Sequence, residues 1–149
     1  MTGAHDDELV VLVVRAAKAI VDRLRTEHAE GATSPMTVVH GLAVRYLVDR
    51  DDATTVEIAR YLRITKQSAS EVVGLLEHNG IVQRAPHPRD GRARVVLLTD
   101  AGKAKLEDGR RRWQALEDEW RQLVGTDRFD AMREALELYL AADAATPAV

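Results

Sequence analysis

The chain of 149 residues contains no cysteine. This absence excludes disulfide bonds, metal sites built on thiolates and the sensing of oxidants through a thiol. The sequence also has no apolar run that approaches the roughly 20 residues of a membrane-spanning helix. Its start, MTGAHDDELVVLVV, lacks the basic stretch and the cleavage site of a secretory signal, so we expect a cytoplasmic protein that does not bind a membrane.

Sequence signatures of catalysis are missing as well. There is no glycine-rich phosphate loop, no elbow around a nucleophilic serine, no HExxH and no paired-carboxylate pattern. No two histidines stand four residues apart, and no cysteine or carboxylate cluster completes a metal site around any of them. We therefore expect no enzyme, no metal and no cofactor. The histidines are His5, His28, His40, His78 and His87.

Charge is unevenly distributed along the chain. The whole chain has a formal net charge of −3, but the segment from Arg63 to Arg94 holds six basic and three acidic residues and so carries +3. A local basic patch on an acidic body can bind phosphates at one place and repel them elsewhere. Nucleic acid is therefore a candidate partner despite the acidic total.

Two helices joined by a tight turn are predicted between Thr54 and Asn79. Thr54 and Glu57 form a capping-box pair that begins the first helix, and Thr65 caps the second. The apolar spacing favours a helix-turn-helix whose second helix directs a polar face toward bases and phosphates. The alternative is an amphipathic core helix with a solvated face. The candidate DNA contacts here are Thr65, Lys66, Gln67, Ser68 and Ser70.

A β-hairpin with a basic tip follows the helix pair. Residues 81–85 and 94–98 have the composition of strands, and Pro88-Arg89-Asp90-Gly91 between them is typical of a turn. An arginine-rich tip beside a recognition helix is the layout of a wing, which contacts the minor groove or the DNA backbone. Alternatively, the arginines only protect a strand edge from aggregation. The candidate wing residues are Arg84, Arg89, Asp90, Arg92 and Arg94, with Asp90 expected to pair with Arg92.

Long helices are predicted on both sides of this segment. Apolar spacing indicates helices over about 6–30, 35–48, 100–124 and 128–142, the second with Ser34 as its N-cap and Pro35 at its first position. The first helix is apolar almost all round at its start, and residues 100–124 have the spacing of a coiled-coil seam, so we expect a partner surface. The predicted seam residues are Leu9, Val13, Leu116, Trp120 and Leu136.

These elements predict a mainly α (α+β) fold: a winged helix-turn-helix with flanking N- and C-terminal dimerisation helices. Residues 35–99 would form the DNA-binding region, and residues 1–34 and 100–149 the dimerisation region.

Several motifs resemble the multiple-antibiotic-resistance regulator (MarR) family of bacterial transcription factors. Asp90-Gly91-Arg92 followed by Val96-Leu97-Leu98-Thr99 and Gly102 is similar to that family's D-x-R wing motif running into L-T-x-x-G. Leu76-Glu77 with Gly80-Ile81-Val82 and Arg84 is similar to its L-E-x-x-G signature, and Val56-Glu57-Ile58-Ala59 to its first recognition-unit helix. The order of the helices matches as well. In one departure, Glu71 and Gly74 stand where the family often has a basic and an acidic residue.

The resemblance implies a homodimer that straddles a pseudo-palindromic site in successive major grooves of double-stranded DNA. It also implies a repressor that releases DNA when a small, often phenolic, ligand binds. His40, Tyr46 and Trp113 are candidates to line the ligand pocket, the alternative being that they are dimer-core or surface residues. The competing hypothesis for the whole chain is a protein–protein adaptor that uses the winged fold without DNA.

Overall fold

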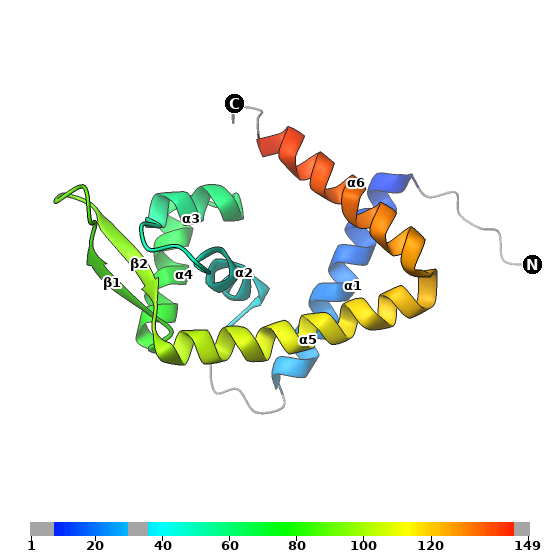
Figure 1. Ribbon diagram of the computed structural model, residues 1–149, viewed down its shortest axis with the longest axis horizontal. Coiled ribbons are helices and arrows are strands. Elements are labelled where there is room, and N and C mark those ends of the chain that lie inside the picture. The colour runs from blue at the N-terminus through cyan, green and yellow to red at the C-terminus, as the bar shows by residue number, and fades with distance from the viewer. Residues whose placement is uncertain (1–7, 30–35, 145–149) are drawn as a thin grey trace, which may run out of the picture. The chain divides into compact units, whose positions relative to one another are not determined.

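A computed structural model of the chain describes residues 8–29 and 36–144, and its contacts divide the chain into two units, Met1–Leu106 and Glu107–Val149. The structure is mainly helical with one two-stranded antiparallel sheet, which confirms the predicted fold class (Figure 1). The elements are α1 (Leu9–Ala29), α2 (Val38–Tyr46), α3 (Thr55–Leu62), α4 (Lys66–His78), β1 (Val82–Pro86), β2 (Arg94–Leu98), α5 (Asp100–Val124) and α6 (Thr126–Ala144).

The helix-turn-helix is formed by α3 and α4. Glu57 accepts hydrogen bonds from the backbone N–H and the hydroxyl of Thr54, at 2.7 and 2.9 Å, so the predicted capping box begins α3. Arg63 ends that helix in the left-handed region, with φ of 55°, and this reversal directs the chain into α4. A common core holds α2, α3, α4 and the sheet together. Its buried members are Ala43, Val44, Leu47, Ala53, Ile58, Val72, Val73, Leu76, Ile81, Val82 and Val96.

The hairpin is joined to the helical part on two sides. On one side, the backbone N–H of Val96 donates to the carbonyl of Ala53 at 2.8 Å, and Thr54 forms a bridge with Val95. On the other, the start of α5 passes close under the carbonyl oxygen of Ile81. A Cβ at Gly102 would overlap that oxygen, so only glycine fits there. The base of the hairpin is therefore fixed in place.

The structure corrects several predicted boundaries. The second helix begins at Val38 rather than at position 35, because the backbone N–H of Thr37 donates to Nδ1 of His40 and makes Thr37 the N-cap. Ser34 and Pro35 lie outside the described residues. The same helix ends at Tyr46, two residues earlier than predicted, and α6 begins at Thr126, also two residues early.

The second unit packs around one aromatic ring. Phe129 of α6 is buried and meets Trp120 of α5 edge to face, with ring centroids 6.2 Å apart. Arg121 lies over the Phe129 ring at 4.4 Å, and Arg133 pairs with Glu117 at 2.9 Å. Trp120, which the sequence assigned to a dimer seam, thus has an intrachain partner at the corner between α5 and α6.

Candidate nucleic-acid interface

The outer face of α4 is polar, as the sequence predicts. Lys66, Gln67 and Glu71 are exposed, and Ser70 is half-buried. Among the described residues, none lies within hydrogen-bonding or ion-pairing distance of the side chains of Lys66 or Gln67. These two side chains are therefore available to an external partner.

Two other predicted contacts on α4 already have a local role. The Thr65 hydroxyl accepts from the backbone N–H of Ser68 at 3.1 Å and donates to the Ser68 hydroxyl at 2.9 Å. This pair caps the N-terminus of α4 and leaves its first backbone N–H groups facing outward, where they suit a phosphate. Contact of Thr65 and Ser68 with DNA stays a prediction.

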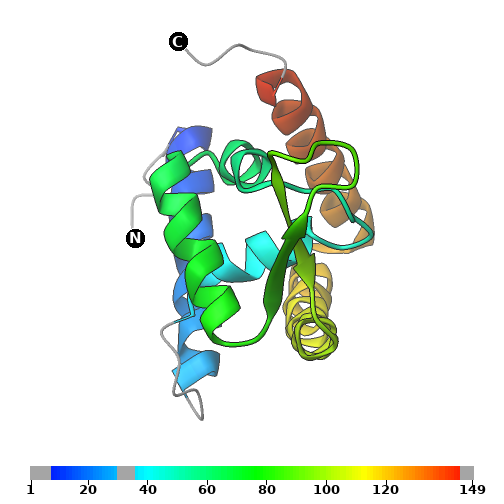
Figure 2. The same cartoon turned by 90° about the vertical axis from the view of Figure 1, so that its left-hand side faces the viewer.

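The wing lies beside α4 in the same folded unit. Figure 2 shows the hairpin and α4 side by side, and β1 packs against α4. The strands pair from Val82 with Leu98 to Pro86 with Arg94, so the tip consists of residues 87–93. This juxtaposition gives one surface a helix that can enter a groove and a basic tip that can reach the neighbouring backbone.

Two arginines at the base of the wing are held by protein groups. Nε of Arg84 donates to the Glu77 carboxylate at 3.2 Å, and the Arg94 guanidinium donates to the carbonyl oxygen of Arg84 at 3.3 Å. Both contacts are exposed enough to exchange for another partner. In the free protein, however, both guanidinium groups donate hydrogen bonds to protein groups.

The tip itself is ordered by backbone hydrogen bonds. Oδ1 of Asp90 accepts from the backbone N–H of Arg92 at 3.0 Å, and the Asp90 carbonyl accepts from Ala93 at 3.1 Å. We expected Asp90 to pair with the side chain of Arg92. Instead, the Asp90 carboxylate binds the backbone N–H of Arg92, and the Arg92 side chain is exposed. No carboxylate in the described part of the chain lies within ion-pair distance of the Arg92 guanidinium.

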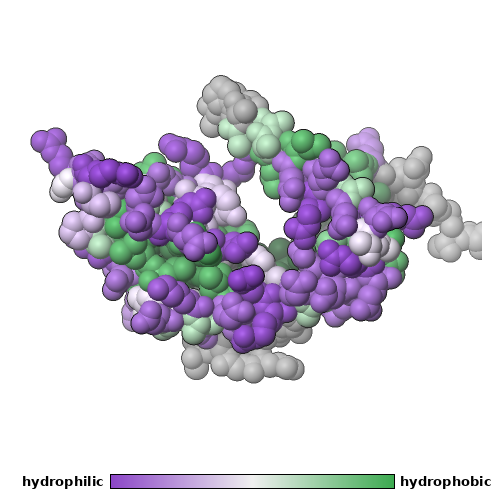
Figure 3. Space-filling view, viewed as in Figure 1, coloured by the Kyte–Doolittle hydropathy of each residue, from purple (hydrophilic) through white to green (hydrophobic). Residues whose placement is uncertain are grey.

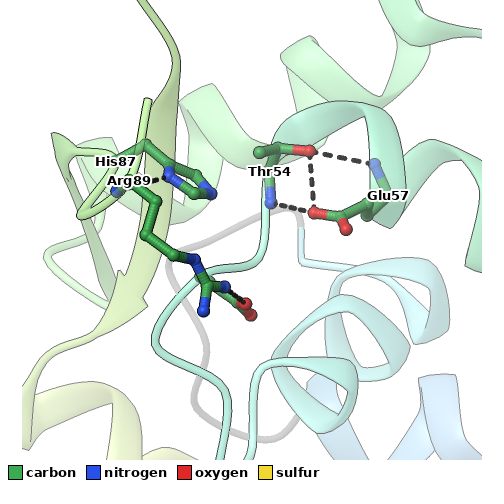
Figure 4. A network of polar contacts seen from close by, with 5 residues as sticks. Thr54, Glu57, His87 and Arg89 are labelled. Atoms are coloured by element: carbon green, nitrogen blue, oxygen red, sulfur yellow. Dashed lines mark hydrogen bonds and ion pairs between the residues drawn. The ribbon is translucent and has the colours of Figure 1, made fainter. Parts of the chain in front are cut away.

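Arg89 reaches back to the body of the unit. Its guanidinium pairs with the carboxylate of Asp52 at 2.7 Å, and its backbone N–H donates to Nδ1 of His87 at 3.1 Å (Figure 4). Asp52 belongs to the loop between α2 and α3, and sequence reasoning missed it. The contact joins residues 37 positions apart, for which no local sequence pattern exists.

Two ionisable groups of the first unit, Glu57 and His40, have shifted pKa values. Hydrogen bonds from the backbone and hydroxyl of Thr54 lower the pKa of Glu57, so its carboxylate stays charged and the cap of α3 stays intact. Burial lowers the pKa of His40, which keeps its ring neutral. Over residues 8–29 and 36–144, no group of three or more histidine and carboxylate side chains is arranged to hold a metal ion.

The candidate pocket residues occupy different surroundings. His40 is buried and caps α2, whereas the Tyr46 ring contacts the Tyr61 ring, with centroids 4.6 Å apart, and has the Arg50 guanidinium over it at 4.3 Å. Trp113 belongs to the second unit. A ligand pocket that includes these residues stays a prediction. Among the described helices, none is both long and apolar enough to cross a bilayer.

Comparisons with known proteins agree with this arrangement. The model of the MarR family matches residues 34–93. The chain is 33% identical to the transcriptional activatory protein BadR of Rhodopseudomonas palustris over 53% of this chain, and the match spans only 45% of BadR. It is 29% identical to an HTH-type transcriptional regulator of Mycobacterium tuberculosis over 73% of this chain and 76% of that protein.

The solved structures show the same fold. The transcriptional repressor CouR, bound to a 23-mer DNA duplex, superposes with a TM-score of 0.78 at 23% identity, over 94% of this chain and 97% of that one. The winged helix-turn-helix architecture expected from the sequence is therefore confirmed.

Proposed function

We propose that this chain is a transcriptional regulator of the MarR family, whose model matches residues 34–93, and that it controls transcription by binding double-stranded DNA. The observation that carries the proposal is an exposed Arg92, without a carboxylate partner in the described chain, on the ordered tip of a hairpin whose strand β1 packs against α4. In this proposal, α4 enters the major groove and Gln67 contacts base edges there. Arg92 contacts the adjacent minor groove or its phosphates.

We also propose a homodimer. In the single chain, the start of α1 and much of α6 expose apolar side chains, among them Leu9 at 75% and Tyr139 at 68% exposure. Figure 3 shows the apolar residues of α6 gathered at the top of the view. Exposed apolar surface on each of these helices favours burial against a partner. A second copy would also bring two wings to the two halves of a pseudo-palindromic site.

The dimer is tested by mass in solution. Val13→Asp introduces a charge at a position that is 45% exposed in the chain alone, so the fold of each subunit should survive. We expect the wild type to have twice the mass of the chain and the variant to have half of that value. A wild type of single-chain mass, with helicity unchanged in the variant, would contradict the homodimer.

We propose repression of a neighbouring gene, relieved by a small ligand such as a phenolic compound, as the direction of regulation. The relatives of this fold include a protein named as a repressor and one named as an activatory protein. A reporter fused to the neighbouring promoter distinguishes the two. Deletion of the regulator should raise expression, and a fall would identify an activator.

The alternative is an adaptor that binds protein and not DNA. A salt titration separates the two functions, because a protein that neutralises phosphates loses affinity steeply as salt rises. We expect binding to a duplex from upstream of the regulator's own gene, weakened both by salt and by Arg92→Ala. No binding at low salt would favour the adaptor.

A DNA-binding regulator needs no catalytic group and works in the cytoplasm, where the chromosome lies.

A further inference from the structure

The turn of residues 87–93 projects beyond the last paired residues of the hairpin, Pro86 and Arg94. Its internal hydrogen bonds fix the shape of the turn but not its angle to α4. Among the described residues, one ion pair joins this turn to the rest of the unit, that between Arg89 and Asp52 (Figure 4). The direction of the turn is therefore set largely by the β-ladder and by this contact.

Asp52 is a rigid point of attachment. It directly precedes Ala53 and Thr54, which pair with β2 through the 2.8 Å hydrogen bond from Val96 and the bridge to Val95. Ala53 is itself buried in the core, and Thr54 is fixed by the capping box. A side chain tied to Asp52 is thus tied to the frame that also carries α3 and α4.

The ion pair adds little to the free energy of unfolding, because the Arg89 and Asp52 side chains are 75% and 44% exposed. The ion pair instead restricts the position of the turn. Arg92 follows Arg89 by three residues in the same hydrogen-bonded turn, so holding Arg89 restricts where the Arg92 guanidinium can lie.

We propose that Asp52 is a positioning residue for DNA binding: through Arg89 it holds the wing so that Arg92 meets the duplex. Arg89 then acts as the tether of the wing and not as a phosphate contact. This inference rests on the proposed function. It assigns a role to an acidic residue that, by charge alone, would weaken binding to DNA.

Whether Asp52→Asn strengthens or weakens DNA binding distinguishes a positioning role of Asp52 from an effect of its charge alone. Removing a carboxylate near a duplex strengthens binding when charge alone matters. If Asp52 positions the wing, Asp52→Asn instead weakens binding about 3- to 10-fold, the cost of ordering a loosened turn. Asp51→Asn is the matched control, because it removes the same charge from an exposed neighbour and should leave affinity equal or slightly higher.

The experiment uses the full chain and a duplex taken from directly upstream of its own gene. Affinity is measured over a range of salt for the wild type, the two asparagine variants and Arg89→Met. We expect Asp52→Asn and Arg89→Met to weaken binding equally and the double variant to lose no more than either. The slope of log affinity against log salt should stay unchanged in Arg89→Met. A direct phosphate contact would instead lower it by about one per subunit.

Exchanging the two charges completes the test. The pair Asp52→Arg with Arg89→Asp restores the ion pair with reversed polarity, so we expect affinity close to the wild type. Tighter binding by Asp52→Asn, or weak binding by the exchanged pair, would overturn the inference. If the wild type binds no duplex at all, the proposed function fails. If it binds but Asp52→Asn behaves like Asp51→Asn, only the positioning role fails.

Discussion

The two parts of the candidate interface, α4 and the wing, present very different chemistry. The outer face of α4 carries an amide, hydroxyls, one cation at Lys66 and one anion at Glu71. The wing carries four arginines, but protein groups occupy three of them and leave Arg92. The difference indicates a division of roles, in which α4 discriminates between sequences and one wing side chain adds affinity for any sequence. Counting arginines would have overstated the charge available to DNA.

The largest effect is expected from a substitution that disturbs the folded unit carrying both α4 and the wing. Gly102→Ala places a Cβ against the carbonyl of Ile81, where backbone must move. We expect a loss of about 3 kcal/mol in the free energy of unfolding, measured by urea denaturation. Gly109→Ala lies in the same helix with open space around its Cβ and is the matched control, expected to be neutral or slightly stabilising. Equal stability of the two variants would contradict the close approach.

The second effect tests discrimination by α4. Gln67→Ala should cost about 1–3 kcal/mol on the preferred duplex and much less on a scrambled one, because an amide that contacts a base edge is lost. Competition binding with single-base-pair variants of the site measures the change. A uniform loss across all sequences would show that Gln67 contacts the backbone instead.

The third effect tests the affinity supplied by the wing. Arg92→Ala should weaken binding about tenfold on preferred and scrambled duplexes alike and lower the salt slope by about one per subunit. Arg84→Ala is the comparison, since Glu77 already holds that guanidinium. Its loss should be smaller. Greater loss in Arg84→Ala would reverse the assignment within the wing.

The smallest effect lies outside both parts, at the start of α2. Burial lowers the pKa of His40 below its ordinary value of 6.5, so the folded protein favours the neutral ring that accepts from Thr37. Because burial disfavours the charged ring, the stability that depends on a neutral His40 is complete above pH 6.5 and declines as the pH falls toward the pKa of the folded state. His40→Gln keeps a capping side chain without titrating. Its unfolding free energy should therefore depend less on pH than that of the wild type as the pH falls below 6.5. Parallel pH profiles would contradict this account.

Local chemistry explains what could be predicted from the sequence. The caps at Thr54 and Thr65 depend on partners three residues away, and both were found where expected. The start of α2 was missed because Nδ1 of His40 accepts the hydrogen bond that completes its capping box. Glutamate or glutamine is the usual residue at that position. The Asp52–Arg89 pair had no local signal, since only the folded hairpin brings its partners together.

The role of Asp90 shows a limit of a different kind. Sequence spacing placed its carboxylate near Arg92, and that was correct. The spacing could not tell whether the backbone N–H or the guanidinium of Arg92 would donate the hydrogen bond to that carboxylate. In a turn the backbone donor is closer and already oriented, and Asp90 bonds to it at 3.0 Å. The result leaves Arg92 available, which is the point on which the proposed function depends.

The central claim is that α4 and Arg92 together bind DNA. It is tested most directly by the affinity of the wild type and of Arg92→Ala for a duplex from upstream of the gene, measured from low to physiological salt. We predict that the wild type binds this duplex more tightly than a scrambled one, with affinity falling steeply as salt rises, and that Arg92→Ala weakens both complexes. Binding that is absent at low salt, or unchanged in Arg92→Ala, would contradict the account.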